Sequence, residues 1–177
     1  MLNTKTLKQF QEELGSKNPT PGGGVVAALT ASFAASLIEM VCNLTLGKEK
    51  YQKVQKDIIK IHKRAVEIKK RTTKLAEEDK KAFDKVMTAY RMENNPTSPR
   101  LRGARQIAIK KALKYAIEVP MQVRRLAIEI EELAVKVAKI GNKNAYSDVK
   151  TAVHLSQAAQ KSALENIKIN KESLKKL

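Results

Sequence analysis

The chain has 177 residues, enough for one domain with a sizeable core. Thirty-five Lys and Arg against 18 Asp and Glu give a net charge of +17, which favours anionic partners such as nucleic acid, acidic surfaces or polycarboxylate ligands. Aromatic residues make up only 4%, which disfavours binding of nucleic acid by base stacking. One cysteine excludes an internal disulfide, two histidines do not make a recognisable metal site, and the amino terminus has no secretory pattern. We therefore expect a cytoplasmic protein without a bound metal.

The first predicted element is an amphipathic helix from Leu2 to Leu14, closed by Gly15. The loop after it ends in the run Pro19-Thr20-Pro21-Gly22-Gly23-Gly24. Glycines allow backbone N–H groups to approach a ligand, and the start of a helix attracts negative charge, so Gly22, Gly23 and Gly24 form a candidate binding site. A tight entry turn would need similar residues, and the ending of a Walker loop is missing.

From Gly22 to Leu46 the chain is almost wholly apolar. The run is long enough to cross a membrane, but it is rich in Ala and Ser and contains Glu39 and Asn43, which are unfavourable in lipid. We predict instead the central helix of a bundle, covered by neighbours on every side. Ser32, Ser36, Glu39 and Asn43 share one stripe of this helix, which indicates either a hydrogen-bonded seam between helices or one wall of a ligand site.

Gly47 ends this helix, and a long charged helix is predicted from about Lys48 towards Tyr90 or Met92. Asp79 lies within its apolar stripe, four residues after Leu75 and four before Phe83. The pattern therefore predicts a partly buried carboxylate. An acid in such a place either pairs with a neighbouring helix, or reaches solvent where the long helix bends, or belongs to a functional site.

A loop rich in proline and asparagine is predicted over Asn94–Pro99, followed by a helix from about Arg100 to Glu118. Pro120 predicts a kink or a break, because it has no N–H to donate. A further amphipathic helix then runs to Ile140.

The last helix follows a polar turn that begins at Gly141, and Ser147 or Asp148 is predicted to cap it. Its apolar face includes Asp148, Asn166 and Asn170, while His154 lies on the opposite, solvent-facing side. Because no strand alternation or repeat is present, the chain is predicted to be all-α, a bundle of about six helices forming one domain over residues 1–177.

Several motifs together resemble the cyclodeaminase domain of formiminotransferase-cyclodeaminase and its stand-alone methenyltetrahydrofolate cyclohydrolase relatives. The resemblance runs in the same order along nearly the whole chain. It rests on Pro-Thr-Pro-Gly-Gly-Gly, Met40-Val41-Cys42-Asn43-Leu44-Thr45-Leu46-Gly47-Lys48, Asp79-Lys80-Lys81-Ala82-Phe83, Val119-Pro120, Gly141-Asn142-Lys143-Asn144-Ala145-Tyr146-Ser147-Asp148, and Asn166 with Ile169-Asn170.

The resemblance implies an all-helical homodimeric enzyme of one-carbon metabolism. Its substrate would be a tetrahydrofolate derivative, possibly polyglutamylated, with no tightly bound cofactor and no membrane partner. Family members either release ammonia from 5-formiminotetrahydrofolate or interconvert methenyl and 10-formyl forms through water. Both reactions require proton transfer at a tetrahedral carbon between N5 and N10.

The resemblance also implies site roles. Asp79 is the first candidate for the proton-transferring acid, and Asp148 is the second or else binds the N–H groups of the pterin. The backbone at Gly22 to Gly24 and the cations Lys48 and Lys50 suit the glutamyl tail. The polar residues expected to orient the pterin or the attacking water, or otherwise to bind substrate, are Asn43, Asn142, Asn144, Ser147 and Asn166.

Two other classes of function stay open at this point. A basic nucleic-acid-binding helical protein would explain the charge but not a buried Asp79 or Asn166. A non-catalytic dimeric scaffold would explain the small residues of the central helix but not the glycine and asparagine turns. The enzyme interpretation requires the acids to line a cavity, with capacity left for a ligand.

Overall fold

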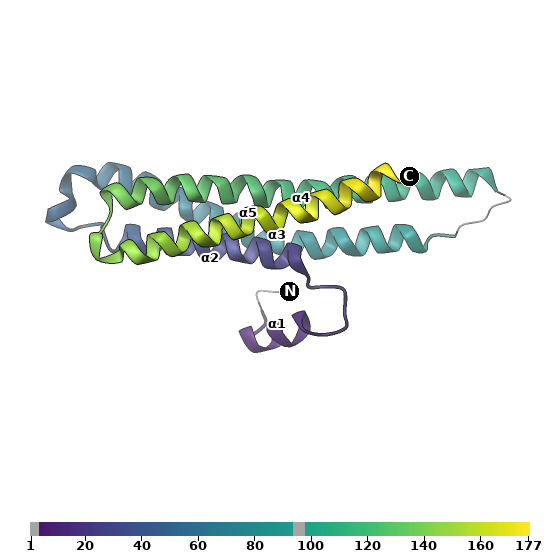
Figure 1. The fold of residues 1–177 in the computed structure, drawn as a ribbon, viewed down its shortest axis with the longest axis horizontal. Helices are drawn as coiled ribbons and strands as arrows, with labels where there is room; N and C mark the ends of the chain where they lie inside the picture. The colour runs from purple at the N-terminus through teal and green to yellow at the C-terminus, as the bar shows by residue number, and fades with distance from the viewer. Residues whose placement is uncertain (1–3, 94–97) are drawn as a thin grey trace.

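A computed structural model describes residues 4–93 and 98–177, and within these ranges the fold is all-α, as predicted (Figure 1). Most of the predicted loop Asn94–Pro99 and the first residues of the predicted amino-terminal helix lie outside the described residues. The described helices are α1 (Leu7–Leu14), α2 (Gly23–Asn43), α3 (Gln55–Arg91), α4 (Pro99–Ile140) and α5 (Tyr146–Lys175), with short 3-10 helices η2 (Glu49–Val54) and η3 (Lys143–Ala145).

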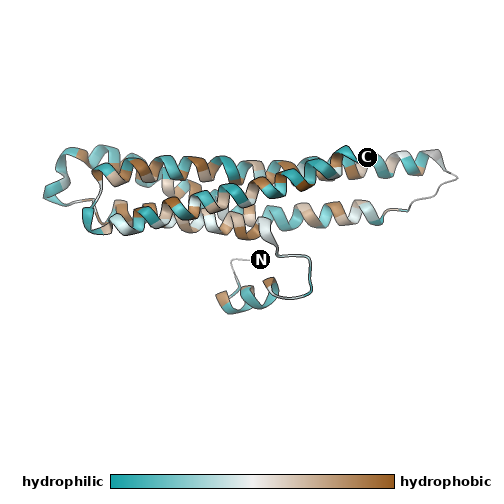
Figure 2. Cartoon of the chain, viewed as in Figure 1, coloured by the Kyte–Doolittle hydropathy of each residue, from teal (hydrophilic) through white to brown (hydrophobic). Residues whose placement is uncertain are grey.

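The core lies where α2 packs against α3, α4 and α5. Ala28, Ala31 and Ala35 of α2 are fully buried, and their small side chains allow the neighbouring helices to pack closely. Among the described residues, α2 alone has the length and hydropathy of a membrane span, and more than half of its most apolar window is buried inside the bundle. In Figure 2, α2 is mostly brown and white, whereas the longer helices show many hydrophilic residues. The prediction of a central Ala-rich helix is confirmed.

One face of α2 is nevertheless uncovered, which corrects the expectation that neighbours surround this helix. Phe33 is 57% exposed, Leu44 41% and Met40 36%, and Leu29 and Leu37 are only partly buried. These five residues follow helical spacing and form one apolar stripe from Leu29 to Leu44, the residue that caps the end of α2. Apolar side chains therefore occupy even the part of α2 that the other described helices do not cover.

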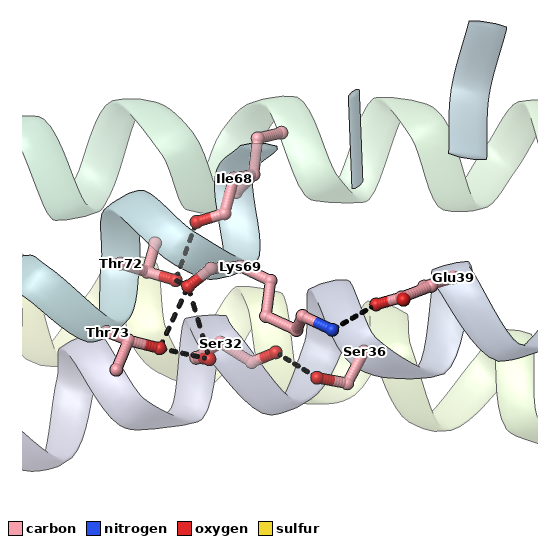
Figure 3. A network of polar contacts seen from close by, with 7 residues as sticks. All are labelled: Ser32, Ser36, Glu39, Ile68, Lys69, Thr72 and Thr73. Atoms are coloured by element: carbon pink, nitrogen blue, oxygen red, sulfur yellow. Dashed lines mark hydrogen bonds and ion pairs between the residues drawn. The ribbon is translucent and has the colours of Figure 1, made fainter. Parts of the chain in front are cut away.

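The polar stripe of α2 forms a hydrogen-bonded seam with α3 (Figure 3). The Ser32 hydroxyl lies 3.0 Å from that of Thr73, and the Ser36 hydroxyl donates to the Ser32 carbonyl. Lys69 forms an ion pair with Glu39 at 2.5 Å. Of the two interpretations of this stripe, the structure favours the seam between helices, because its hydroxyls and its carboxylate already have partners within the bundle.

The helix α4 runs unbroken through Pro120, so of the predicted kink or break the break does not occur. The described ranges hold five α-helices, which is roughly consistent with the predicted bundle of about six. It begins with Ser98 as amino-terminal cap and Pro99 in its first turn, which suits a residue without an N–H. Pro120 is buried in the middle of the helix. The carbonyl of Ala116, which loses its usual donor there, accepts a hydrogen bond of 2.8 Å from the side chain of Asn170 on α5. This bond and the packing on both sides of Pro120 allow the helix to continue.

The small helix α1 stands beside the bundle rather than inside it (Figure 1). Thr6 and Gln9 form a capping box at its start, and Gly15 ends it as predicted. None of its residues is buried, and Phe10 contacts the edge of the core. The loop from α1 leads directly into the glycines at the start of α2.

Candidate active site

A cavity of about 360 Å³ lies where the start of α2 meets α3, α4 and α5. Its polar lining includes the Asp79 side chain from α3 and the Asn166 and Asn170 side chains from α5. Its apolar lining includes Phe83 and Leu113. The predicted glycines Gly22, Gly23 and Gly24 form its wall on the α2 side.

Close approach explains why glycine occupies position 24. A Cβ atom at Gly24 would lie 2.3 Å from Oδ1 of Asp79 and 2.5 Å from its Oδ2, distances at which the carboxylate would have to move. A Cβ at the neighbouring Gly23 would meet nothing closer than the Asn166 amide nitrogen at 3.8 Å. The first turn of α2 is thus shaped around the Asp79 carboxylate.

The Asp79 carboxylate has no hydrogen bond or ion pair within the described ranges 4–93 and 98–177, although it is partly buried. Burial without a compensating charge raises its pKa from the ordinary 3.8 to about 6. The alternative of a structural Asp paired with a neighbouring helix is therefore not what the structure contains. A pKa near 6 suits a group that both accepts and returns a proton near neutral pH.

The two asparagines of α5 line the same cavity. The Asn166 amide nitrogen donates to the Ser162 carbonyl at 2.9 Å, one turn earlier in α5. The Asn170 amide nitrogen donates to the Ala116 carbonyl of α4, as described above. In each side chain one N–H of the amide is bound to a backbone carbonyl, so the amide oxygen and the second N–H have capacity for a ligand.

The remaining predicted residues gather at the far end of the bundle, where α2 ends and α5 begins. Asn142 is buried there, and its amide nitrogen donates to the Leu44 carbonyl at 2.9 Å. Its amide oxygen accepts a hydrogen bond from the backbone N–H of Asn144, and its own backbone N–H donates to the Thr45 hydroxyl. These bonds fasten the turn after α4 to the turn after α2. The Asn142 side chain therefore has a structural role in this turn, and its expected role in substrate binding stays a prediction.

The start of α5 also differs from its prediction. The helix begins at Tyr146 with Ala145 in the capping position, and no side chain caps it, so neither Ser147 nor Asp148 is a cap. Asp148 is half-buried in the first turn and has no hydrogen bond or ion pair to any described residue. The side chains of Ser147, Asn144, Asn43, Lys48 and Lys50 are exposed around it.

One chain therefore does not bring all the predicted site residues together. Asp148 and Asn166 are 18 residues apart in the continuous helix α5, which corresponds to about 27 Å. Asp79, Gly22, Gly23, Gly24 and Asn166 line the cavity. The cluster around Asp148 lies at the opposite end of α2.

Sequence reasoning did not assign Asn170 or Thr20 to the site, although both line the cavity. Asn170 shares the face of Asn166, and the missing N–H of Pro120 indicated that a carbonyl needed a donor; the residue that supplies it was not readable from the sequence. A larger groove of about 470 Å³ lies between α3 and α4, with Ile61 and Leu133 at its floor and lysines at its rim. It contains no buried acid without a partner, so the Asp79 cavity is the candidate active site.

Cys42 and His154, whose side chains could ligate a metal in other settings, both lie outside the cavity lining. Cys42 is buried in α2, and burial raises the pKa of its thiol to about 12, so the thiol stays protonated as a core residue. His154 is exposed on α5, as predicted. Among the described residues, no group of three His, Cys, Asp or Glu side chains is arranged to hold a metal ion.

The bundle and its cavity define a helical protein whose candidate chemistry depends on one desolvated carboxylate flanked by amides and helix-start glycines. A match to the family described as Formiminotransferase-cyclodeaminase covers residues 6–176. The chain belongs to this family, which confirms the resemblance noted in its motifs.

Individual relatives agree with this assignment. The methenyltetrahydrofolate cyclohydrolase of Methylorubrum extorquens is 37% identical over 174 residues, which cover 98% of this chain and 83% of that protein. The formimidoyltransferase-cyclodeaminase of Rattus norvegicus is 26% identical over 165 residues, which cover 93% of this chain but only 30% of that protein. The crystal structure of formiminotetrahydrofolate cyclodeaminase from Thermotoga maritima has a TM-score of 0.87 and 32% identity, covering 98% of this chain and 82% of that one.

Proposed function

We propose that this protein is an enzyme of folate-dependent one-carbon metabolism, a methenyltetrahydrofolate cyclohydrolase or a formiminotetrahydrofolate cyclodeaminase. The family and the named relatives support this substrate class. The observation that carries the chemistry is Asp79, a partly buried carboxylate without a partner among the described residues, at the wall of a cavity. Asp79 is assigned as the group that moves protons at the one-carbon unit.

The cyclohydrolase reaction uses Asp79 first as a base. Asp79 takes a proton from a water molecule while the oxygen of that water bonds to the carbon that bridges N5 and N10. This step gives a tetrahedral carbon. The bond from this carbon to N5 then breaks, N5 takes the proton from Asp79, and the hydroxyl proton passes to solvent. The product is the 10-formyl form.

The cyclodeaminase reaction uses the same group on a different leaving atom. N10 attacks the carbon of the protonated formimino group, and Asp79 removes the proton that N10 then carries. Asp79 returns this proton to the amino group, which leaves as ammonia when its bond to carbon breaks. Both reactions need one carboxylate with a pKa near the working pH, and no resident cofactor enters either sequence of steps.

We also propose that the enzyme works as a homodimer formed through α2. The uncovered stripe of Leu29, Phe33, Leu37, Met40 and Leu44 supports this, because an apolar face of this length is usually buried against a partner. A two-fold axis at Phe33 would pair two α2 helices in antiparallel orientation. Gly23 and Asn43 are each ten residues from Phe33, so Gly23 of one chain would lie opposite the partner's Asn43.

This arrangement would unite the two separated groups of predicted residues. The cavity beside Asp79 would receive the bundle end of the partner, with the partner's Asp148 and Asn43 near the substrate. The exposed cations Lys48 and Lys50 would face the carboxylates of the glutamyl tail. Each active site would then contain residues from both chains.

The first test follows the absorbance of 5,10-methenyltetrahydrofolate after enzyme is added, starting from the formimino substrate and separately from the 10-formyl substrate. Turnover in either assay supports the proposal, and its direction identifies the reaction. A protein that binds none of these folates and turns none of them over would contradict the proposed function.

A second test addresses the shared site. The inactive variants Asp79→Asn and Asp148→Asn are mixed under conditions that exchange subunits. Half of the dimers are then mixed, and one of the two sites in each mixed dimer has both carboxylates intact, so about a quarter of the wild-type activity returns. No recovery, with subunit exchange verified by differently tagged chains, would contradict a site built from two chains.

A further inference from the structure

We propose that Pro120 fixes the orientation of the Asn170 side chain, so that the Asn170 oxygen binds an N–H group on the pterin ring of the substrate. The proposal rests on the proposed function, and it adds a substrate-contacting residue and a positioning residue to the site. The N–H that is missing at Pro120 in α4 would thus determine which groups of the ligand, its N–H donors, bind at Asn170.

The first step concerns the Ala116 carbonyl. In an uninterrupted α-helix this carbonyl accepts a hydrogen bond from the N–H of residue 120. Pro120 has no N–H, and both Ala116 and Pro120 are buried, so water cannot easily replace the lost donor. The Asn170 amide nitrogen donates to this carbonyl at 2.8 Å from the facing helix. Asn170 therefore supplies the donor that Pro120 lacks.

The second step concerns which way the amide points. A carbonyl oxygen only accepts, so the nitrogen of the Asn170 amide has to face Ala116, and a reversed amide would bring two oxygens together. The Asn170 oxygen is thereby directed away from Ala116. It has no hydrogen-bond partner within the ranges that the structure describes, and the residue lines the Asp79 cavity. The side chain is held as an acceptor for a ligand.

The third step concerns the ligand. Asn166 also has its nitrogen bound to a backbone carbonyl, so the α5 side of the cavity offers two amide oxygens. The α2 side offers helix-start N–H groups at Gly23 and Gly24. A ring system fits this pattern when its N–H and amino groups face α5, as the amino-pyrimidinone part of a reduced pterin can. A ligand edge made only of carbonyl or carboxylate oxygens would leave these two amide oxygens without a donor.

The experiment uses the variant Pro120→Ala, which restores an N–H for the Ala116 carbonyl and releases the Asn170 amide. We expect the KM for the folate substrate to rise about threefold to tenfold, as for a weakened hydrogen bond, while kcat stays within about twofold because Asp79 is unchanged. A purely structural role of Asn170 predicts an unchanged KM, since this variant repairs the helix.

A double-mutant cycle gives the second readout. Asn170→Leu is expected to lower thermal stability in the wild-type background, and to lower it much less together with Pro120→Ala, because the Ala116 carbonyl then has its own donor. The matched control is Asn166→Leu, whose backbone partner lies within α5. Its effect on stability should add to that of Pro120→Ala without coupling.

Amide hydrogen exchange of the Asn170 side chain, followed by NMR, tests the orientation without any turnover. Protection in the wild type that disappears in Pro120→Ala supports the fixed orientation, and equal exchange in both proteins overturns it. An unchanged KM in Pro120→Ala overturns the substrate contact even when stability couples. If the wild type turns over no folate, both the proposed function and the substrate contact of Asn170 are contradicted. The orientation of the Asn170 amide is then still tested by hydrogen exchange and by the double-mutant cycle of stability.

Discussion

The cavity beside Asp79 and the turn at the far end of the bundle both contain polar side chains removed from solvent, but the hydrogen bonding of these side chains differs. At the far end, the buried Asn142 side chain is bonded to Leu44 and Asn144, and it holds two turns together. In the cavity, the Asp79 carboxylate is partly buried and no described residue pairs with it. Residue type alone therefore does not separate a binding site from a structural turn.

The difference lies in unused hydrogen-bonding capacity. A buried polar group without a partner destabilises a fold, so it persists where a ligand or a reaction uses it. The asparagines of the cavity are intermediate, because one backbone bond orients each amide and the oxygen is left over. Substitutions in the two regions should thus give opposite patterns of activity and stability.

The largest expected effect is on the turnover of Asp79→Asn. An amide keeps the shape of the side chain but cannot accept and return a proton, so kcat should fall by about a thousandfold. The pH profile of kcat/KM in the wild type should have a limb near pH 6, where the Asp79 carboxyl titrates, and the residual activity of the variant should lack it. Initial rates between pH 5 and 8 measure both effects.

The control is Asp84→Asn, an exposed Asp five residues further along α3. It should leave turnover and the limb near pH 6 unchanged. Full turnover in Asp79→Asn would remove the assignment of Asp79 and return the site to a purely binding role.

The next effect is on stability and follows from the same carboxylate. Because the pKa of Asp79 is about 6 in the folded protein and 3.8 ordinarily, the folded state binds more protons between these values. The free energy of unfolding therefore falls as pH rises through this window. Asp79→Asn lacks this loss, so it should be more stable than the wild type by up to about 3 kcal/mol above pH 6 and similar to it below pH 4. Urea unfolding at four pH values tests the curve, and a constant difference would contradict it.

Gly24→Ala, like Asp79→Asn, should lower turnover without destabilising the fold. The new methyl group would overlap the Asp79 carboxylate and displace it, and a displacement of about 1 Å can reduce the rate by about a hundredfold. The fold should survive, because alanine favours helix and the atom that has to move ends a side chain. Gly103→Ala is the control, because Gly103 lies in α4 outside this cavity and an added Cβ would meet nothing within 4 Å, so turnover should not change. Equal effects of the two variants would contradict the close fit around Asp79.

The fold was readable from the sequence where periodicity decides it. The apolar stripes predicted for the long helices are buried, as Ile58, Leu75 and Ile130 show. Gly47, predicted to end the central helix, lies with a positive φ of 72° in the turn that follows the end of α2 at Asn43. The continuity of α4 was not readable, because it depends on a donor from a residue 50 positions beyond Pro120. The sequence around a proline shows that a backbone N–H is missing, but it does not show that a side chain from another helix supplies the donor.

The candidate site was readable in part. Asp79 was found because a charged residue interrupts an apolar stripe, and the glycines because they start the apolar helix. Asn142 was expected to bind substrate, yet its partners come from residues almost a hundred positions earlier, which a sequence pattern does not reveal. The stripe of Ser32 and Ser36 had two interpretations for the same reason, and the hydroxyl of Thr73 favours the seam.

The smallest expected effect compares two asparagines across the two regions. Asn142→Ala removes the bond to the Leu44 carbonyl and the acceptor for the Asn144 N–H, so the free energy of unfolding should fall by about 2 kcal/mol. Asn166→Ala removes one bond within an exposed part of α5, so stability should fall by less than about 0.5 kcal/mol while the KM for folate rises several-fold. Urea denaturation and steady-state kinetics on both variants give the four values. A stable Asn142→Ala protein with a raised KM would contradict the structural role. It would mean that the hydrogen bonds of Asn142 contribute little to the fold and that this side chain binds substrate.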